Sequence, residues 1–455
     1  MIRRNMKICL VTLSFFFGGV TNTLFALENG NLPTNEEIST VTISSLVELE
    51  TLAKEVNSGN DFKGQCIKLA GDINLTSDES VDGKATDWES IGYCISNNKF
   101  IKNFFKKSRS FNGTFDGNGY TINCNVNNFT NDNKNIKSSA IFGCIGKHGE
   151  VKNLNIAGKI TTKGDNKIAL SGLCDTNYGL IENCNVRASV EGNTGSIGIC
   201  LNNYGKIRNC NVRGKFISQD LVCAGIAGYN YSIIENCDVK AVLTNCAAKS
   251  SNTSDGFINP ETGGISSFNY GKISECSVDS YINNKNIDIN VKYELYIENQ
   301  KNCESKSNDG SAGGIASTNN GLIENCTVKG AINAYKVGGI AAKNYETIKN
   351  CKVGGCISGV IVGGIAAQNV SGDNKLFSKF ALSSNGGLVE NCDVKGEIKT
   401  LFLAGTIICK IYWNDARGQV RNCNAECTTI EYKNANKIKK RYLVGTSFIQ
   451  NFNYL

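Results

Sequence analysis

The chain contains few of the residues that enzymes use most often for catalysis. Histidine occurs once in 455 residues, at position 148, so the sequence holds neither an HExxH zinc motif nor a second imidazole ligand. A Ser-His-Asp or Cys-His mechanism would depend on His148 alone, which lies in a Lys-His-Gly turn. The sequence therefore predicts no catalytic site, no metal site and no cofactor.

A pattern of roughly 20 residues recurs eight or nine times and determines where the remaining polar residues lie. Its clearest copy runs from Gly313 to Ile332, and an earlier one covers residues 172–190. Apolar and polar residues alternate in short runs separated by Gly and Asn, which is the period of a β-strand. Such units stack at ~4.8 Å into a solenoid. We therefore expect an all-β fold, a parallel β-helix (β-solenoid) of about nine coils, whose handedness and cross-section stay open.

The repeat places cysteines in inward columns. The main column takes one residue from each copy, with Leu154 substituting once: Cys124, Cys184, Cys210, Cys237, Cys276, Cys326, Cys351, Cys392 and Cys423. A second column contains Cys144, Cys174 and Cys200 and continues with Ala and Ser. Stacked neighbours at ~4.8 Å lie beyond the usual ~3.8 Å Cβ separation of a disulfide, so we expect reduced ladders. Cys246 and Cys303, in insertions of adjacent coils, are the best disulfide candidates.

Two polar columns accompany the cysteines. Asparagine precedes the main column and suits a left-handed bend, with Glu275 as the exception: Asn123, Asn153, Asn183, Asn209, Asn236, Asn325, Asn350, Asn391 and Asn422. Tyrosine recurs at a turn as Tyr178, Tyr204, Tyr231, Tyr270 and Tyr345, with His148 and Asn320 at equivalent places. An outward tyrosine stripe could stack on sugar rings, or each ring could pack over its own turn.

A basic column runs along the predicted rod through Arg187, Arg213, Lys240, Lys329 and Lys395, broken by Asp279 and Gly354. It could bind an acidic polysaccharide, or form a solvated face interleaved with the glutamates Glu182, Glu235, Glu324 and Glu390. The net charge of +7 is modest, and three of the positive charges lie in the first seven residues. Nucleic acid is not an expected partner, because no concentrated basic face is evident.

The ends differ from the repeats. Residues 1–26 have the order of a secretory signal: basic residues, an apolar run at 8–20 and a small residue at the predicted cleavage site, Ala26. No later segment is apolar enough to cross a membrane, so we expect a secreted or cell-surface protein. Residues 27–110 form a predicted cap and leader, with an amphipathic helix whose apolar face is Leu46, Leu49, Leu52, Ala53 and Val56. The solenoid is placed at 111–430, with insertions at 244–261, 283–311 and 370–385, and a C-terminal cap at 431–455.

The copies, which read GGIA..N.G.IENC.V.G.I, resemble the GLUG-motif repeats of bacterial surface proteins. The leader through Trp88 and residues 111–119 (FNGTFDGNG) is similar to the segment that precedes such repeats. The resemblance covers residues ~45–430 and implies an exported, adhesin-like protein. GLUG repeats also accompany IgA-cleaving metallopeptidases, but this chain lacks their zinc-binding helix. It also shows no LPxTG signal.

Three hypotheses follow. The first is a non-catalytic adhesin-like rod that binds a glycan or a surface protein of a host or the environment. The second is a polysaccharide lyase or hydrolase on a β-helix scaffold, which requires clustered carboxylates on one outer face. The third is a structural component of an envelope layer, which self-association would favour. The sequence predicts the first and leaves the ligand, the attachment and the oligomeric state open.

Overall fold

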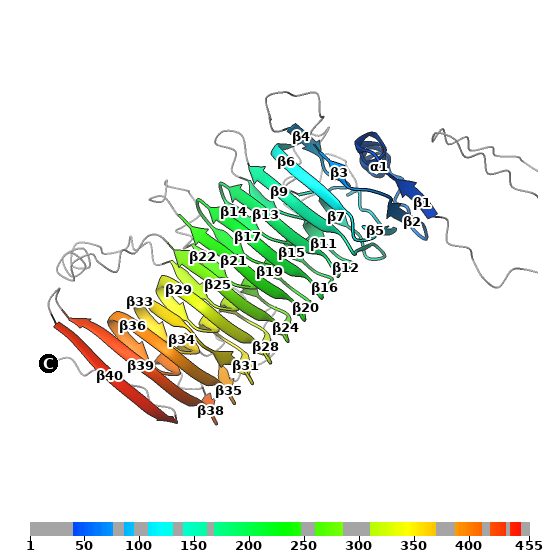
Figure 1. Ribbon diagram of the computed structural model, residues 1–455. Coiled ribbons are helices and arrows are strands. Elements are labelled where there is room, and N and C mark those ends of the chain that lie inside the picture. The colour runs from blue at the N-terminus through cyan, green and yellow to red at the C-terminus, as the bar shows by residue number, and fades with distance from the viewer. Residues whose placement is uncertain are drawn as a thin grey trace, which may run out of the picture. The chain divides into compact units, whose positions relative to one another are not determined.

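Short strands of three to eight residues, separated by glycine and asparagine, build most of the protein. The computed structural model describes residues 40–75, 86–94, 108–130, 140–161, 168–246, 260–284, 310–369, 387–411, 419–433 and 437–446. These residues form a parallel β-solenoid in which each coil hydrogen-bonds to the next (Figure 1). The expected fold class is confirmed. The predicted signal, residues 1–26, lies outside the described residues.

One coil shows how the repeat is folded. Cys174–Asn177 (β11) lies in one sheet, Leu180–Glu182 (β12) in a second, and Asn185–Gly192 (β13) with Gly195–Ile197 (β14) in a third. The chain then enters the next coil at Cys200–Asn203 (β15), which pairs in parallel with β11. The solenoid therefore has three sheets, here called A, B and C.

Sheet A stacks the short strands that precede the main cysteine column: β1 (Thr40–Ile43), β2 (Cys66–Leu69), β5 (Thr114–Asp116), β8 (Glu150–Lys152), β12, β16 (Lys206–Arg208), β20 (Ile233–Glu235), β24 (Lys272–Ser274), β28 (Leu322–Glu324), β31 (Thr347–Lys349), β35 (Leu388–Glu390) and β38 (Gln419–Arg421). Sheet C stacks nine strands, which matches the expected coil number: β7 (Phe142–Ile145), β11, β15, β19 (Ala227–Asn230), β23 (Ser266–Asn269), β27 (Ala316–Asn319), β30 (Ala341–Asn344), β34 (Ala366–Asn369) and β37 (Ile408–Ile411).

Sheet B carries the longest strands and has the most members: β3 (Ile73–Asn74), β4 (Thr86–Glu89), β6 (Thr121–Thr130), β9 (Asn155–Thr161), β10 (Ala169–Ser171), β13, β14, β17 (Asn211–Ser218), β18 (Val222–Ala224), β21 (Asp238–Asn245), β22 (Glu261–Gly263), β25 (Ser277–Asn284), β26 (Ser311–Gly313), β29 (Thr327–Gly338), β32 (Lys352–Val353), β33 (Cys356–Gly363), β36 (Asp393–Gly405), β39 (Asn424–Lys433) and β40 (Lys437–Thr446). Its strands are parallel except for β40, which is antiparallel to β39 and ends the sheet.

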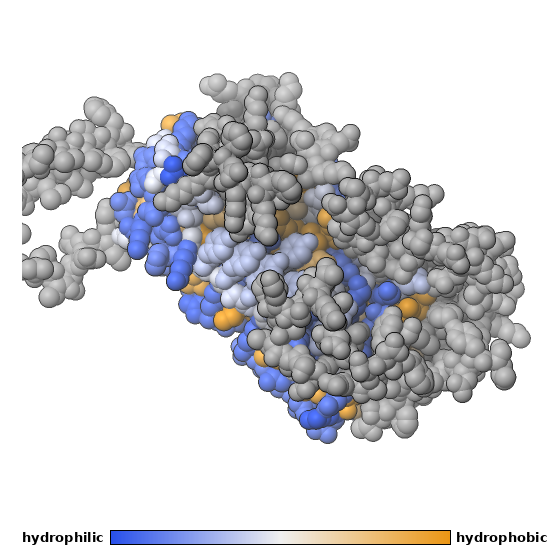
Figure 2. Space-filling model, turned by 180° about the vertical axis from the view of Figure 1, so that it is seen from behind, coloured by the Kyte–Doolittle hydropathy of each residue, from blue (hydrophilic) through white to orange (hydrophobic). Residues whose placement is uncertain are grey.

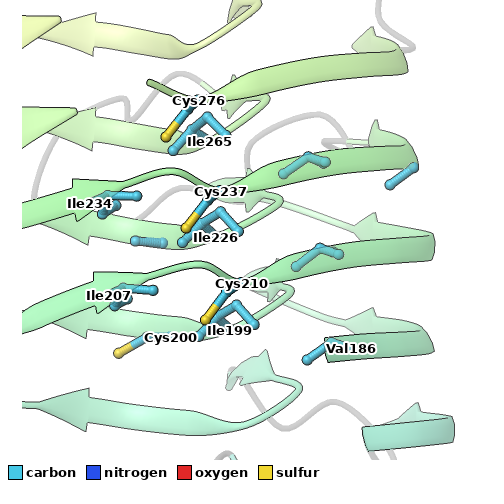
Figure 3. Packing of buried hydrophobic residues seen from close by; sticks show 14 of the residues in the cluster. Val186, Ile199, Cys200, Ile207, Cys210, Ile226, Ile234, Cys237, Ile265 and Cys276 are labelled. Atoms are coloured by element: carbon cyan, nitrogen blue, oxygen red, sulfur yellow. The ribbon is translucent and has the colours of Figure 1, made fainter. Parts of the chain in front are cut away.

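The core is a set of in-register columns between the three sheets. In sheet A, Ile181 lies beside Ile207 and Ile207 beside Ile234, all fully buried. In sheet B, valine occupies the equivalent inward position, as in the pair Val186 and Val212. Figure 3 shows this stacking, with cysteine on cysteine and isoleucine on isoleucine in successive coils. Identical side chains repeat because each position packs against its own copy.

An internal asparagine ladder joins successive coils at the end of sheet C. Each amide nitrogen donates to the side-chain oxygen of the next coil at 2.8 to 2.9 Å, through Asn177, Asn203, Asn230, Asn269, Asn319, Asn344 and Asn369. All seven side chains are fully buried. Asn230 also donates to the carbonyl oxygens of Ser232 and Lys272 and accepts from the Ser232 N–H. The sequence analysis did not predict this ladder.

The outer asparagine column forms the bend between sheets A and B. Its residues adopt left-handed φ angles of about 50°, as in Asn183 (53°) and Asn209 (54°), and Glu275 takes the same conformation at 56°. Asn123 is an error in the predicted column. It lies inside β6, whereas Asn118 (52°) makes the bend of that coil. The Gly117–Gly119 turn holds two more residues than the bend of the next coil, since Asp116 pairs with Lys152 whereas Thr121 pairs with Asn155, and the column position of this coil is therefore Tyr120.

The same longer turn removes Cys124 from the main cysteine column. Cys124 lies opposite Gly158, and the Tyr120 carbonyl receives the hydrogen bond from Asn155 that the column position should receive. Cys124 is still buried, at 3% exposure, because side chains alternate along β6 and Cys124 lies on its inward face. The other eight cysteines and Leu154 are buried at the expected positions.

The N-terminal cap contains the predicted helix, α1 (Leu46–Ser58). Ser45 and Glu48 form a capping box at its start, and Gly59, at a φ of 119°, ends it. Leu49, Leu52, Ala53 and Val56 are buried as expected, and Leu46 is partly buried against the core. Such a helix covers the open end of a stack of strands.

Two boundaries differ from the prediction. β1 pairs with β2 and β2 pairs with β5, so sheet A begins at Thr40 rather than at residue 111. The insertions are narrower than expected, because β21 extends to Asn245, β22 starts at Glu261, β25 extends to Asn284 and β26 starts at Ser311. Residues 247–259, 285–309 and 370–385 of the three insertions lie outside the described residues.

Replacing Asn230 by leucine is expected to lower the urea midpoint strongly, because one N–H of the buried Asn203 amide and the Ser232 N–H lose their acceptor, and the Asn269 oxygen loses one of its two donors. The cost of each unsatisfied group is about 1–3 kcal/mol. The matched control is Asn236→Gly in the same coil, where the side chain is exposed and glycine accepts the left-handed φ of 50°. Equal midpoints for the two variants would contradict the structural role of the ladder.

Candidate functional site

The main cysteine column is a structural ladder of buried thiols. Each thiol donates to the carbonyl oxygen two residues earlier, as Cys210 does to Arg208 (3.2 Å) and Cys237 to Glu235 (3.3 Å). The same bond recurs in Cys276, Cys326, Cys351, Cys392 and Cys423. Cysteine fits this position because it is a small hydrophobe that also satisfies a carbonyl at the bend. All of these thiols are free, as expected.

The second cysteine column is only partly as predicted. Cys174 pairs with Cys200, and Cys200 pairs with Ala227, so this part is confirmed. Cys144 was placed wrongly, because it lies opposite Thr176 and forms a disulfide with Cys94. The turn at residues 146–149 is longer than in later coils, which shifts the register by two residues. Cys246 is half-buried and Cys303 lies outside the described residues, so their pairing stays a prediction.

The tyrosines form a stacked ladder on the outside of the turn between sheets C and A. Ring centroids are 5.1 Å apart for Tyr178 and Tyr204, 4.6 Å for Tyr204 and Tyr231, and 5.1 Å for Tyr231 and Tyr270, with interplanar angles of 3 to 12°. Both ring faces of Tyr204 and Tyr231 are therefore occupied by neighbouring tyrosines. Stacking on a sugar requires a free face, so these two rings offer a ligand only their edges and hydroxyls. Tyr345 is half-buried, and in the coil before it Asn320 holds the ladder position.

Three of the four outward glutamates of sheet A, Glu182, Glu235 and Glu324, are paired with cations of neighbouring coils, whereas Glu390 has no ion pair among the described residues. Glu182 contacts Arg208 (2.8 Å), and Glu235 contacts Lys206 (2.5 Å). Glu324 contacts both Lys272 (2.7 Å) and Lys349 (2.9 Å), and hydrogen bonds from these two lysines lower the pKa of its carboxyl. A general acid needs a raised pKa, so Glu324 is unsuited to that role. Viewed from behind, hydrophilic residues with single hydrophobic ones among them line one edge of the solenoid (Figure 2).

The cations of sheet B are arranged differently. Arg187 and Arg213 occupy the same outward position of adjacent strands, β13 and β17. Both are exposed, and neither has an ion pair among the described residues. Lys159 on β9 and Lys215 on β17 are also exposed in the next outward column, with Ser189 between them. We call these four side chains the basic face of sheet B.

The basic face borders two shallow hollows. The first, of about 130 Å³, is lined by Asn185, Arg187, Asn211 and Arg213. The second, of about 340 Å³, shares Asn185 and Arg187 with the first, so the two adjoin; its other lining residues are Thr121, Asn123, Asn155, Ile156 and Ala157. The outward position beside Arg187 is the short Ala157, which leaves space next to the guanidinium.

Beyond Arg213 the basic column is interrupted by ion pairs, although Lys329, beside Asp279, is exposed and has no ion pair among the described residues. Lys240 contacts Asp279 at 3.5 Å, and Lys395 contacts Glu426 at 3.3 Å. Of the three basic residues predicted to face a ligand, Arg187 and Arg213 are therefore unpaired and Lys240 is paired. The sequence analysis missed Lys159 and Lys215, although their columns follow from the repeat once the strand register is known.

The sequence analysis also missed a buried ion pair. The carboxylate of Glu261 contacts Lys343 at 2.7 Å, and it accepts hydrogen bonds from the Ser317 and Thr318 hydroxyls. Glu261 is 4% exposed. Because the carboxylate has three protein partners, we interpret the cluster as a structural link between coils. Glu261 was assigned to an insertion, so its strand position was not recognised.

In the part of the chain that the structure describes, no three His, Cys, Asp or Glu side chains gather in a metal-binding arrangement. The described helix, α1, is too short and too polar to cross a membrane.

Comparison with known proteins gives a short list of similarities. No family model matches the chain. A protein of Evansella cellulosilytica named "Putative Gly-rich membrane protein" is 31% identical over 139 residues, which are 30% of this chain and 14% of that protein. A crystal structure of a "putative immunoglobulin A1 protease" from Bacteroides ovatus aligns with 85% of this chain and 84% of its own, at 15% identity and a TM-score of 0.33. The chain thus matches a small part of the first protein's length, and the second similarity is too low to assign a function.

The buried thiols are expected to make the protein less stable at alkaline pH. Burial raises the pKa of the Cys124 thiol to about 12, whereas an unfolded thiol ionises near 8.5. Between these values the unfolded chain loses a proton that the folded chain keeps, so the free energy of unfolding falls as pH rises, by ~1.4 kcal/mol per unit for this thiol. Urea unfolding at pH 8 and pH 10 should show a smaller fall for Cys124→Ala than for the wild type. Identical falls would contradict the buried, protonated thiol.

Proposed function

We propose that this protein is an exported, non-catalytic recognition rod that acts at a cell surface or after secretion, as an adhesin-like protein does. The observation that carries the proposal is the contrast between two outer surfaces. Three of the four outward glutamates of sheet A are held in ion pairs, whereas sheet B presents two arginines without an ion pair, beside a row of amides, over adjoining hollows. Unpaired polar groups on a rigid sheet suit ligand binding better than bond cleavage.

Two further observations support this proposal. The GLUG-like repeats resemble those of exported surface proteins, and the matched segment of the Evansella relative belongs to a protein named as a membrane protein. A basic N-terminal segment followed by an apolar run is also typical of secretion. A rod built in this way suits binding to a glycan and binding to a surface protein equally well.

Electrophoresis through gels cast with different glycans tests the function. We expect the purified protein to be retarded in at least one glycan gel, with no loss of glycan staining around the band. A cleared zone would contradict the non-catalytic role and favour the lyase or hydrolase. Unchanged mobility in every gel, together with concentration-dependent self-association, would instead favour an envelope component.

A further inference from the structure

We propose that the basic face of sheet B is a binding site for a linear acidic polysaccharide, one that carries carboxylate or sulfate groups along its chain. The inference rests on the proposed recognition function and adds the site and the chemical class of the ligand. It is argued from the charges, the amides and the outer shape of strands β9, β13 and β17.

The three strands carry an excess of positive charge. They hold four cations, Lys159, Arg187, Arg213 and Lys215, and one carboxylate, Glu191. Glu191 lies two outward positions beyond Arg187 and accepts a hydrogen bond from Ser189. On the next strand, β21, the aspartate Asp238 lies beside Asn211, and Lys240 forms an ion pair with Asp279. The unpaired positive surface therefore ends at β17. The local excess of positive charge therefore matches a short polyanionic segment.

A row of three side-chain amides lies beside the cations. Asn211 donates to Asn185 at 2.9 Å, and Asn185 donates to Asn155 at 2.8 Å, which fixes the three amides in one row beside the arginines. An amide nitrogen has two N–H donors, and this ladder uses one of them. The remaining donors are available to the hydroxyl and ring oxygens of sugars. A row of amides next to a row of cations suits a ligand that alternates hydroxyl and acidic groups.

The strands set the spacing of the cations along the solenoid axis. Arg187 and Arg213 lie on adjacent strands, whose separation is ~4.8 Å. Lys159 and Lys215 lie two strands apart, or about 10 Å along the solenoid axis. An extended polysaccharide with one acidic group per sugar, such as polygalacturonate, presents its charges at about the arginine interval, and every second charge falls at about the lysine interval. Because the side chains are carried by hydrogen-bonded strands, this spacing is set before the ligand binds, which lowers the entropy cost of binding.

The outer composition disfavours two other polyanions. Single-stranded nucleic acid is bound largely by aromatic side chains that stack on bases, but Phe216, the one aromatic residue of these three strands, is fully buried. Membrane surfaces are bound by amphipathic elements that insert large apolar side chains. Here the outward positions hold Asn, Arg, Lys, Ser, Thr, Ala and one Glu, with half-buried Ile217 as the large apolar exception.

The test compares variants in binding to defined probes. Fluorescently labelled polygalacturonate supplies carboxylates, dextran sulfate supplies sulfates, and neutral dextran is the uncharged control. We expect the wild type to bind at least one acidic probe, more weakly as salt is raised, and to leave dextran unbound. The double variant Arg187→Gln/Arg213→Gln should weaken this binding by about tenfold. Both residues are exposed and unpaired among the described residues, so its urea midpoint should equal that of the wild type.

The matched control is Arg208→Gln, which removes the same charge from the same coil as Arg213 but on sheet A, where Arg208 pairs with Glu182. It should bind the acidic probes within about twofold of the wild type. Equal binding by the double variant and the wild type would overturn the site. Equal or tighter binding of an oligo(dT) strand or of phosphatidylserine-containing vesicles would overturn the ligand class.

Failure of the inference differs from failure of the proposed function. If neither acidic probe binds while a neutral glycan retards the protein in a gel, the basic face is not the site and the recognition rod stands. If an acidic probe is cleaved, the non-catalytic function fails, whatever the variants do.

Discussion

The internal asparagine ladder is the constraint on which the arrangement of the coils depends. Its seven side chains are fully buried, so each amide must find partners inside the protein. It does so by bonding to the same residue of the neighbouring coil and to the backbone of the turn, as Asn230 does through Asn269 and Ser232. A shift of register by one residue would break every such bond at once. The ladder therefore fixes which outer side chains lie side by side.

The repeat was sufficient to predict the fold, because apolar residues that return with a fixed spacing can only be buried by stacking. It also predicted the main cysteine column from Cys184 onward and the left-handed bends from Asn153 onward, and Glu275, the exception in that column, takes the same conformation at a φ of 56°. The errors lie where a turn changes length. After the longer turn before β6 the column position falls on Tyr120 rather than on Cys124, and the turn after β7 displaced Cys144 and hid its disulfide to Cys94. Sequence spacing cannot show how a longer turn is accommodated.

The candidate site was harder to predict than the fold, since it depends on pairing between coils. The sequence placed Arg187, Arg213 and Lys240 in one column but could not show that Lys240 meets Asp279. It left open whether the tyrosines could stack on sugars, whereas Tyr204 and Tyr231 lie between other rings. Only with the register known do Lys159 and Lys215 join the arginines, and only then does the basic face appear as one surface.

The most direct test of the account is to map where an acidic polysaccharide touches the protein. Carbodiimide joins a carboxylate to an amine in direct contact with it, so polygalacturonate can be cross-linked to the protein and the modified lysines identified by peptide mass spectrometry. The account predicts cross-links at Lys159 and Lys215 on the basic face. Cross-links concentrated at Lys206 and Lys272, which pair with glutamates on sheet A, would contradict it.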